Sequence, residues 1–280
     1  MSYNVRSFID DNGERCLDSI VNVIKAMNPD ILCLQEMGFS EIADSLLEPL
    51  KPMPRSLSRD NLSPAIYSRY PIIRASRIDT LKNFAWADIV VKDKNREDTI
   101  RVFNNHLHST AIRRDDSNYL ENHEYFSGDS VGKVYSMIER LTENNRIRAQ
   151  QADTLAAIVA ASPYPAIVCG DFNKDIQEFN LTNNKVNLFK HKQYFCSASK
   201  QVCSPWIVSE NDYVCPGSYY YNDEWERIDH FFVNENVNVI SFEPLINELW
   251  CDENGIPNPY RVYTHKGVSD HLPINCKIDI

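Results

Sequence analysis

Apolar residues recur along this chain with two different periods, and these periods indicate which segments are helices and which are strands. The first helical segment has apolar residues at three- and four-residue spacing. These residues are Leu17, Ile20, Val21, Ile24 and Met27. A much longer helical pattern runs from about Val131 to Ala161. A further helix is expected after Ser40, which can cap a segment that carries Leu46 and Leu47.

Shorter segments with nearly continuous apolar residues are typical of strands that are buried on both faces. DILCLQE at 30–36 and AIVCGDF at 166–172 have this pattern, and we interpret Cys33 and Cys169 as small buried hydrophobic residues. The other predicted strands are SYNV, AIYS, WADIVV, IRVFNNHL, SYYY, IDHFFV, VNVISF and LPINCKI. KDKNRED at 92–98 is expected to form a hairpin loop. LPINCKI is expected at a sheet edge, because Pro273 lacks a backbone N–H.

The order of these segments predicts a single α/β domain that spans residues 1–280. Strand and helix patterns occur in both halves, and no internal repeat or linker-like change in composition divides them. Two mixed sheets packed face to face, with helices outside, would bury the apolar faces. The polar stretch from Lys174 to Val214 is expected to contain helix fragments and long loops. Cys196, Cys203 and Cys215 lie in or beside this stretch, where either free thiols or a disulfide fits the sequence.

The net charge of −10 provides no basic surface for tight non-specific binding to nucleic acid. Nucleic acid stays open as a substrate, because divalent cations can offset clustered acids locally. No apolar run approaches the roughly 20 residues that a membrane-spanning helix needs, so no transmembrane segment is expected. A cytoplasmic monomer is the default expectation. A secreted or periplasmic location would follow if an upstream leader was removed before Met1.

The buried-looking predicted strands share one feature, since they finish in polar residues that can bind a cation or a proton, with Asp229 and His230 expected in the middle of WERIDHFFV. These residues are Asn4, Gln35, Glu36, His106, His108, Asp171, Asn173, Asp229, His230, Asp270 and His271. Because ligands gather at strand ends in open layered folds, we expect these residues to meet at one edge. Oxygen ligands from Asn4, Glu36 and Asp270 would suit Mg²⁺ or Mn²⁺ rather than Zn²⁺.

Each of these residues also has a simpler structural interpretation. Glu36 alone could be a solvated or capping carboxylate, and Asp171 with Asn173 could form only a turn. His106 and His108, two apart on a strand, resemble a metal-binding pair, but no third soft ligand supports zinc. Only the combination of these positions favours a shared metal and phosphate site.

Seven short motifs occur in a fixed order along the chain, namely SYNVR, LQE, YSRYPI, NNHL, GDFN, RIDHFFV and SDHLP. Together they resemble the endonuclease/exonuclease/phosphatase superfamily, whose members include deoxyribonucleases, inositol polyphosphate phosphatases and neutral sphingomyelinases. The resemblance extends over residues 2–274, and GDFN followed by RIDH and SDHLP is its most specific part. It implies a four-layer α/β/β/α sandwich of the deoxyribonuclease I type, dependence on Mg²⁺ or Mn²⁺, and hydrolysis of a phosphate ester.

The resemblance also implies which residues lie on the metal side of the site. Asn4 and Glu36 match the metal-side residues of the first two motifs, and Asp270 matches the acid of the closing SDH motif. Some members have an aspartate two places after the first asparagine, where this chain has Arg6. A second metal site that used this position would lack its acid here.

The catalytic residues that the resemblance implies are His106, Asp171, Asn173, Asp229 and His271. His106 and Asn173 would contact the phosphate, and Asp171 would orient the attacking water. Asp229 would hydrogen-bond His271, fix its tautomer and favour its protonated form. Either Asp171 or His271 could act as the general base.

A Mg²⁺-dependent phosphodiesterase that acts on a nucleic acid or a nucleotide-like substrate is the leading functional hypothesis. The alternatives are a sphingomyelinase-like phosphodiesterase of phospholipid headgroups, a phosphomonoesterase of a small phosphorylated metabolite, and a catalytically inactive binding module. An exposed apolar loop at 195–208 would favour the phospholipid. The aromatic residues Tyr219, Tyr220, Tyr221 and Trp225 could stack a base or contact a lipid headgroup.

Overall fold

A computed structural model describes most of the chain. The described residues are 1–8, 16–37, 46–53, 63–78, 81, 83–93, 96–109, 128–174, 217–221, 224–234, 236–257 and 268–280. Most of the helix expected after Ser40 lies outside these residues. The loops expected at 175–214, with Cys196 and Cys203, and the nearby Cys215 lie outside them as well.

The first sheet has six strands, namely β1 (Ser2–Asn4), β2 (Ile31–Gln35), β3 (Lys51–Pro52), β4 (Ala65–Ser68), β12 (Asn238–Pro244) and β13 (Ile274–Asp279). Their order across the sheet is β12-β13-β1-β2-β4-β3. β1 and β2 are parallel, and the other neighbouring pairs are antiparallel. The sheet is therefore mixed.

The second sheet has five strands, namely β5 (Ile72–Arg77), β6 (Phe84–Asp93), β7 (Arg96–His106), β8 (Ala166–Asp171) and β11 (Asp229–Val233). Their order is β11-β8-β7-β6-β5, and only β7 and β8 are parallel within it. Two short strands, β9 (Tyr219–Tyr221) and β10 (Glu224–Glu226), form a separate antiparallel hairpin.

The described helices are α1 (Leu17–Met27), α3 (Gly128–Ala160) and the short 3-10 turn η1 (Arg6–Phe8). α1 and α3 match the first helical pattern and the long helical pattern of the sequence, and α3 begins three residues earlier than expected. Within the described residues, neither helix contains a stretch that is long and apolar enough to cross a bilayer.

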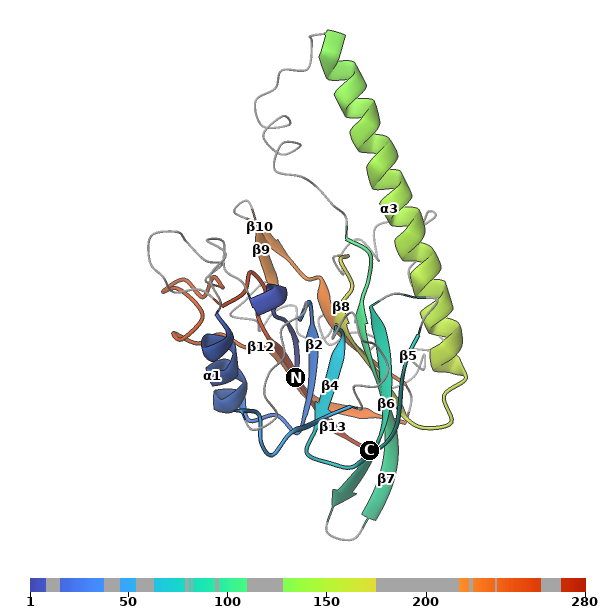
Figure 1. Ribbon diagram of the computed structural model, residues 1–280, viewed down its shortest axis with the longest axis vertical. Helices are drawn as coiled ribbons and strands as arrows, with labels where there is room; N and C mark the ends of the chain where they lie inside the picture. The colour runs from blue at the N-terminus through green and yellow to red at the C-terminus, as the bar shows by residue number, and fades with distance from the viewer. Residues whose placement is uncertain are drawn as a thin grey trace.

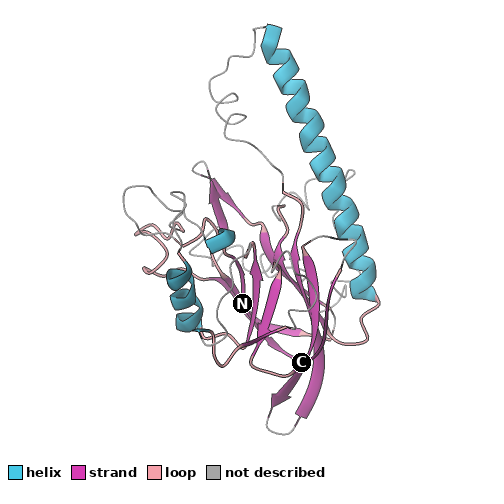
Figure 2. Ribbon diagram, viewed as in Figure 1, coloured by secondary structure: helices cyan, strands magenta, loops and turns pink. Residues whose placement is uncertain are grey.

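Three separate apolar cores arrange these elements in four layers. α1 packs on the first sheet through Ile20 and Ile24. The two sheets face each other across a core that contains the free thiols of Cys33 and Cys169. α3 packs on the outer face of the second sheet through Leu155 and its neighbours. Figures 1 and 2 show this order from α1 to α3, so the predicted α/β/β/α sandwich is confirmed.

Alternation along the strands decides which side chains reach the space between the sheets. In β8, Val168 packs on the α3 side, whereas Cys169 faces the first sheet. Asp171 lies two residues after Cys169 and therefore continues the face between the sheets. In β7, Val102 faces the first sheet, so His106, four residues later, lies on that same face. The polar ends of these strands extend the apolar core between the sheets.

The hairpin between β6 and β7 is tighter than the sequence indicates. β6 continues to Asp93 and β7 begins at Arg96, so most of KDKNRED is paired strand rather than loop. Lys92 and Glu97 lie opposite each other and form an ion pair of 2.6 Å. Such cross-strand pairs of opposite charge favour a strand even in a polar segment. The expected loop at 92–98 is therefore wrong in its length.

The expectation that LPINCKI forms an edge strand is also wrong. β12 and β1 pair on the two sides of β13. Pro273 precedes the first residue of β13, so its missing N–H interrupts no ladder. Its carbonyl accepts a hydrogen bond of 2.8 Å from the backbone N–H of Leu245.

Gly170→Ala is expected to destabilise the fold by about 2–4 kcal/mol. Gly170 has a φ of +135°, and a Cβ there would lie 1.9 Å from the carbonyl oxygen of Asn105 in β7. Gly132→Ala in α3 is the matched control, because an added Cβ there meets no other group of the described residues within 4 Å. Urea-induced unfolding of both variants measures the two effects. Equal stability changes would contradict the close approach of β7 and β8.

Candidate active site

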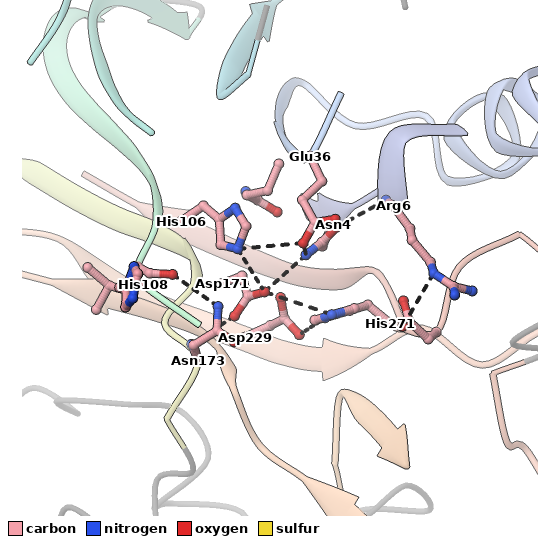
Figure 3. Close-up of polar contacts among 12 residues, drawn as sticks. Asn4, Arg6, Glu36, His106, His108, Asp171, Asn173, Asp229 and His271 are labelled. Carbon is pink, nitrogen blue, oxygen red and sulfur yellow. Dashed lines mark hydrogen bonds and ion pairs between the residues drawn. The ribbon is translucent and has the colours of Figure 1, made fainter. Parts of the chain in front are cut away.

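The strand ends that carry the predicted functional residues lie at one edge of the sandwich. β1 and β2 are parallel, and so are β7 and β8, so the carboxyl ends of each pair lie side by side. β11 is antiparallel to β8, and β13 is antiparallel to β1, so these two strands begin at the same edge. Figure 3 shows the side chains of Asn4, Glu36, His106 and Asp171 directed toward one another.

Asn4, the last residue of β1, links the two sheets at this edge. Its Nδ2 donates hydrogen bonds of 3.0 Å to Glu36 Oε1 and to Asp171 Oδ2. Its Oδ1 accepts a hydrogen bond of 3.0 Å from the backbone N–H of Arg6, which assigns the orientation of the amide. Asn4 is buried. Its amide nitrogen therefore orients two carboxylates that belong to different sheets.

Three side chains with metal-binding atoms converge beside Asn4. The ligand atoms of Glu36, His106 and Asp171 lie within 4.8 Å of one another. His106 Nε2 lies 3.5 Å from Glu36 Oε1 and 3.7 Å from Asp171 Oδ2. This donor set is rich in carboxylate oxygen, so it fits Mg²⁺ or Mn²⁺ better than it fits the nitrogen and sulfur sites of structural zinc.

Asp229 begins β11 directly opposite Asp171 in the ladder and binds His271. Asp229 Oδ2 lies 2.8 Å from His271 Nδ1, and His271 Nε2 lies 3.8 Å from Asp171 Oδ2. Burial alone would lower the pKa of His271. The carboxylates of Asp229, Asp171 and Asp270 outweigh burial and raise the pKa to about 10. His271 therefore carries a positive charge at neutral pH.

Asp171 is a buried acid at the centre of the site. Burial raises its pKa to about 6, with the charge of His271 lowering it and the charge of Asp229 raising it. The backbone N–H of Asn173 donates a hydrogen bond of 2.8 Å to Asp171 Oδ1. At neutral pH the carboxylate is the main form, and it accepts a proton more readily than an ordinary surface aspartate does.

The GDFN segment is held by elements on both of its sides. Asn173 has a φ of +49°, and its Nδ2 donates a hydrogen bond of 3.0 Å to the carbonyl of Leu107 after β7. His230 of β11 lies with its Nε2 3.0 Å from the carbonyl of Lys174, and its ring contacts the ring of Phe172 edge to face. The side chain of Asn173 is thereby placed beside His106 and Asp171 (Figure 3).

Two candidates from the sequence have partners outside this central cluster. β7 ends at His106, and the ring of His108 lies 2.9 Å from Asn144 Oδ1 of α3. The metal-binding pair suggested by the spacing of the two histidines is therefore not formed. Asp270 Oδ2 lies 3.7 Å from Arg6 Nε. No hydrogen bond or ion pair among the described residues joins Asp270 to Glu36.

Sequence analysis missed two buried polar residues, Ser2 and Asn104, directly beneath the site. Gln35 Nε2 donates hydrogen bonds of 3.0 Å to Ser2 Oγ and 2.6 Å to Asn104 Oδ1. Asn104 Nδ2 donates to two carbonyls of β2 and β4 at 3.0 and 2.7 Å. The alternation of β7 places Asn104 on the same face as His106. Asn104 is the first residue of the motif NNHL, but only the alternation along the strand could have shown that it shares the face of His106.

The aromatic cluster divides between the site and the protein interior. The ring of Tyr219 lies 4.8 Å from the ring of His271. The rings of Tyr220 and Trp225 contact each other at 5.1 Å, and Trp225 packs against the core beside α1. The side chain of Tyr221 lies outside the described residues. Among the described rings of this cluster, Tyr219 is the one that reaches the candidate site.

Comparisons with known proteins agree with this arrangement. A family model described as the Endonuclease/Exonuclease/phosphatase family matches residues 1–271. A search of curated proteins found no match. Among solved structures, D. rerio TDP2 in complex with a single-strand DNA product has a TM-score of 0.57 at 12% identity, over 100% of this chain and 97% of that one.

Two further solved structures are similar to this chain over most of its length. The human Nocturnin catalytic domain with bound sulfate has a TM-score of 0.51 at 20% identity, over 94% of this chain and 84% of that one. A mannosyl-6-phosphatase from Bacteroides thetaiotaomicron has a TM-score of 0.51 at 15% identity, over 100% of this chain and 98% of that one. At these identities the similarity shows a shared fold.

Asp229→Asn is expected to lower the pKa of His271, because the carboxylate that stabilises the imidazolium is lost. The folded-state pKa of about 10 lies above the ordinary value of 6.5. The pair therefore stabilises the fold fully below about pH 6.5, and this contribution is lost as the pH rises through about 10. Side-chain NMR of the histidines as a function of pH measures the shift. The ring signals of His108 should stay unchanged and serve as the control, and an unchanged His271 titration would contradict the pairing.

Proposed function

The chain belongs to the endonuclease/exonuclease/phosphatase family, and we propose that it is a Mg²⁺-dependent phosphodiesterase that acts on a nucleic acid or a nucleotide-like substrate. It is a metal-dependent hydrolase of phosphate ester bonds, as its family is. The kind of ester, the metal and the roles of the residues are the subject of the proposal. One observation carries it. Asp171 Oδ2 lies 3.0 Å from Asn4 Nδ2 and 3.8 Å from the charged ring of His271.

We assign Asn4, Glu36 and Asp270 to the metal side of the site. Mg²⁺ keeps several waters and takes only one or two carboxylates together with phosphate oxygens, so the carboxylates of Glu36 and Asp270 suit it, with Mn²⁺ as the other candidate. Asn4 contributes by orienting Glu36 through its Nδ2, since its Oδ1 accepts from the N–H of Arg6. About a third of the Glu36 side chain is exposed, so an ion and a substrate can reach it. When bound, the ion would offset the charge that builds on the phosphoryl oxygens.

Asp171 serves as the general base in this proposal. Its pKa of about 6 leaves it ionised at neutral pH and able to accept a proton from the water that attacks the phosphorus. His271 has a pKa of about 10 and holds its proton, so it donates a hydrogen bond to a phosphoryl oxygen instead. Asp229 orients His271 and keeps it charged. The sequence leaves the choice of base open. Both pKa values are raised, but Asp171 is still mainly ionised at neutral pH whereas His271 keeps its proton, and this difference favours Asp171.

His106 and Asn173 are assigned to the phosphate. His106 stands between Glu36 and Asp171 at 3.5 and 3.7 Å, where a phosphoryl group held near both acids would meet its ring. The amide of Asn173 is fixed by its hydrogen bond to Leu107. Two positioned polar groups reduce the entropy that the substrate must lose to reach a reactive geometry.

Two observations support a nucleic acid or nucleotide-like diester. The structure of D. rerio TDP2, which shares this fold, contains a single-strand DNA product. The ring of Tyr219 beside His271 offers a face on which a base can stack. The loop at 195–208 that would favour a phospholipid lies outside the described residues. Because a mannosyl-6-phosphatase from Bacteroides thetaiotaomicron has a similar structure, a phosphomonoester is the competing substrate class.

Asp171→Asn is expected to lower kcat about 10²–10⁴-fold with the melting temperature nearly unchanged, because the amide keeps the shape of the side chain but cannot accept the proton. Hydrolysis of bis(p-nitrophenyl) phosphate with MgCl₂ measures the effect. Asp153→Asn is the control, since Asp153 lies exposed on α3. Wild-type kcat in Asp171→Asn would rule out the proposed base.

The proposed substrate class is tested by measuring release from a single-stranded oligonucleotide, sphingomyelin and p-nitrophenyl phosphate in parallel. We expect the oligonucleotide to be hydrolysed fastest with MgCl₂, activity to be lost with EDTA, and activity to return with MgCl₂ or MnCl₂. Faster hydrolysis of sphingomyelin would replace the proposal with the phospholipid alternative, and faster hydrolysis of p-nitrophenyl phosphate with the monoesterase. Hydrolysis of none of them with either metal would indicate a binding module.

A further inference from the structure

Three polar side chains on one face of α3 bind a single residue of the segment that follows β7. Asn144, Arg148 and Gln151 are spaced so that they share this face. Gln151 Oε1 accepts a hydrogen bond of 2.8 Å from the backbone N–H of His108, and Arg148 Nη1 donates one of 2.8 Å to its carbonyl. The ring of His108 lies 2.9 Å from Asn144 Oδ1. α3 thereby holds both the backbone and the ring of His108.

Among these three residues, Arg148 is the one whose burial costs the most free energy, because it removes a charged group from water. It is 1% exposed, and burial lowers its pKa to about 10, so it remains charged at neutral pH inside the protein. Its Nη2 also donates to Asn145 Oδ1, and the nearby charge of Asp171 raises its pKa. An apolar residue could cover the sheet at this position without the cost of burying a charge. Its hydrogen bond to His108 and its electrostatic attraction to Asp171 therefore call for a role beyond packing.

The segment that α3 holds also makes direct contacts with the site. The backbone N–H of Leu107 donates a hydrogen bond of 2.9 Å to the carbonyl of Asp171, and the carbonyl of Leu107 accepts one of 3.0 Å from Asn173 Nδ2. His106 precedes Leu107 and presents its ring to Glu36 (Figure 3). Residues 106–108 therefore lie between α3 on one side and GDFN on the other.

The position of α3 explains how its side chains reach this segment. Ala152, Leu155 and Val159 pack on the second sheet. Toward its N-terminus the same face of the helix becomes polar, where it meets the residues after β7. Figure 1 shows that the helix then continues beyond the edge of the sandwich. The change from apolar to polar residues coincides with the edge that carries the site.

We propose that Arg148 is a positioning residue of the phosphoesterase site, which through His108 fixes the places of His106 and Asn173 around the substrate phosphate. This inference rests on the proposed function. A purely structural role for Arg148 predicts a different result, namely a loss of stability with an unchanged kcat for the folded protein.

The test compares Arg148→Met and Arg148→Lys with Arg146→Met. Arg146 is the matched control because it lies on the same helix, is exposed and pairs with Glu143. With bis(p-nitrophenyl) phosphate and MgCl₂, Arg148→Met should lower kcat about 10–100-fold, with little change in KM. Arg148→Lys should recover part of the loss, since an ammonium can still donate to the carbonyl of His108. Arg146→Met should keep the wild-type kcat.

NMR signals of the His106 ring and the Leu107 amide report the position of the segment without relying on activity. They should shift in Arg148→Met and stay unchanged in Arg146→Met. If Arg148→Met does not fold, Asn144→Ala takes its place, because it removes the ring partner of His108 without removing a charge, and the same shifts are expected.

Wild-type kcat in the folded Arg148→Met or Asn144→Ala variant, or unshifted His106 signals, would overturn the inference. An equal loss in Arg146→Met would do so too, since the effect would then not be specific to the buried contact. If the wild type hydrolysed no phosphate ester, the proposed function would fail, whereas the NMR comparison would still decide whether Arg148 positions His106.

Discussion

The candidate site depends on one constraint, the fixed separation and register of the two sheets. Asn104 of β7 donates to two carbonyls of the first sheet and accepts a hydrogen bond from Gln35. Buried amides must find partners, so these bonds hold only when β7 faces β2 and β4 in this register. The contact of Asn4 with Asp171 spans the same gap. A slip of one residue in β7 or β8 would turn His106 or Asp171 toward α3 and remove the site.

Several acids lie at this same edge of the sandwich, and each has different charged partners and a different degree of burial. These acids are Glu36, Asp171, Asp229 and Asp270. Asp229 lies in direct contact with His271, at 2.8 Å, and Asp270 lies 3.7 Å from Arg6. Asp171 is buried and stands farther from His271, so its pKa is raised. Environments that push the pKa values of neighbouring groups apart assign them different roles in acid–base chemistry. The separation of base and proton donor follows from which strand end each residue occupies.

Periodicity made the layers predictable from the sequence, because each strand and helix must bury one apolar face. The strand ends were predictable for the same reason, since GDFN and SDH follow or precede apolar runs. The partners of His108 were not, because a pattern of alternation cannot show that β7 ends at His106. The length of the hairpin at 92–98 was missed because cross-strand ion pairs depend on the partner strand. Contacts between elements remote in sequence, such as Arg148 with His108, leave no local signal.

Left-handed backbone conformations concentrate around the site, and they explain why its geometry is absent from local sequence propensities. The non-glycine residues with positive φ here are Arg6, Ser7, Phe8, Glu36 and Asn173. Each such conformation costs about 1–3 kcal/mol and persists only where surrounding contacts hold it. Asn4 Oδ1 accepts from the N–H of Arg6, and Asp171 Oδ1 accepts from the N–H of Asn173.

The side chains assigned to the chemistry therefore also hold the strained turns beside them. An alanine at Asp171 would remove the acceptor for Asn173 N–H together with the base, whereas an asparagine can keep an oxygen for Asn173 N–H and removes the charge, with its NH₂ replacing the oxygen that accepts from Asn4 Nδ2. Amide substitutions consequently separate the chemistry of this edge from the backbone that supports it.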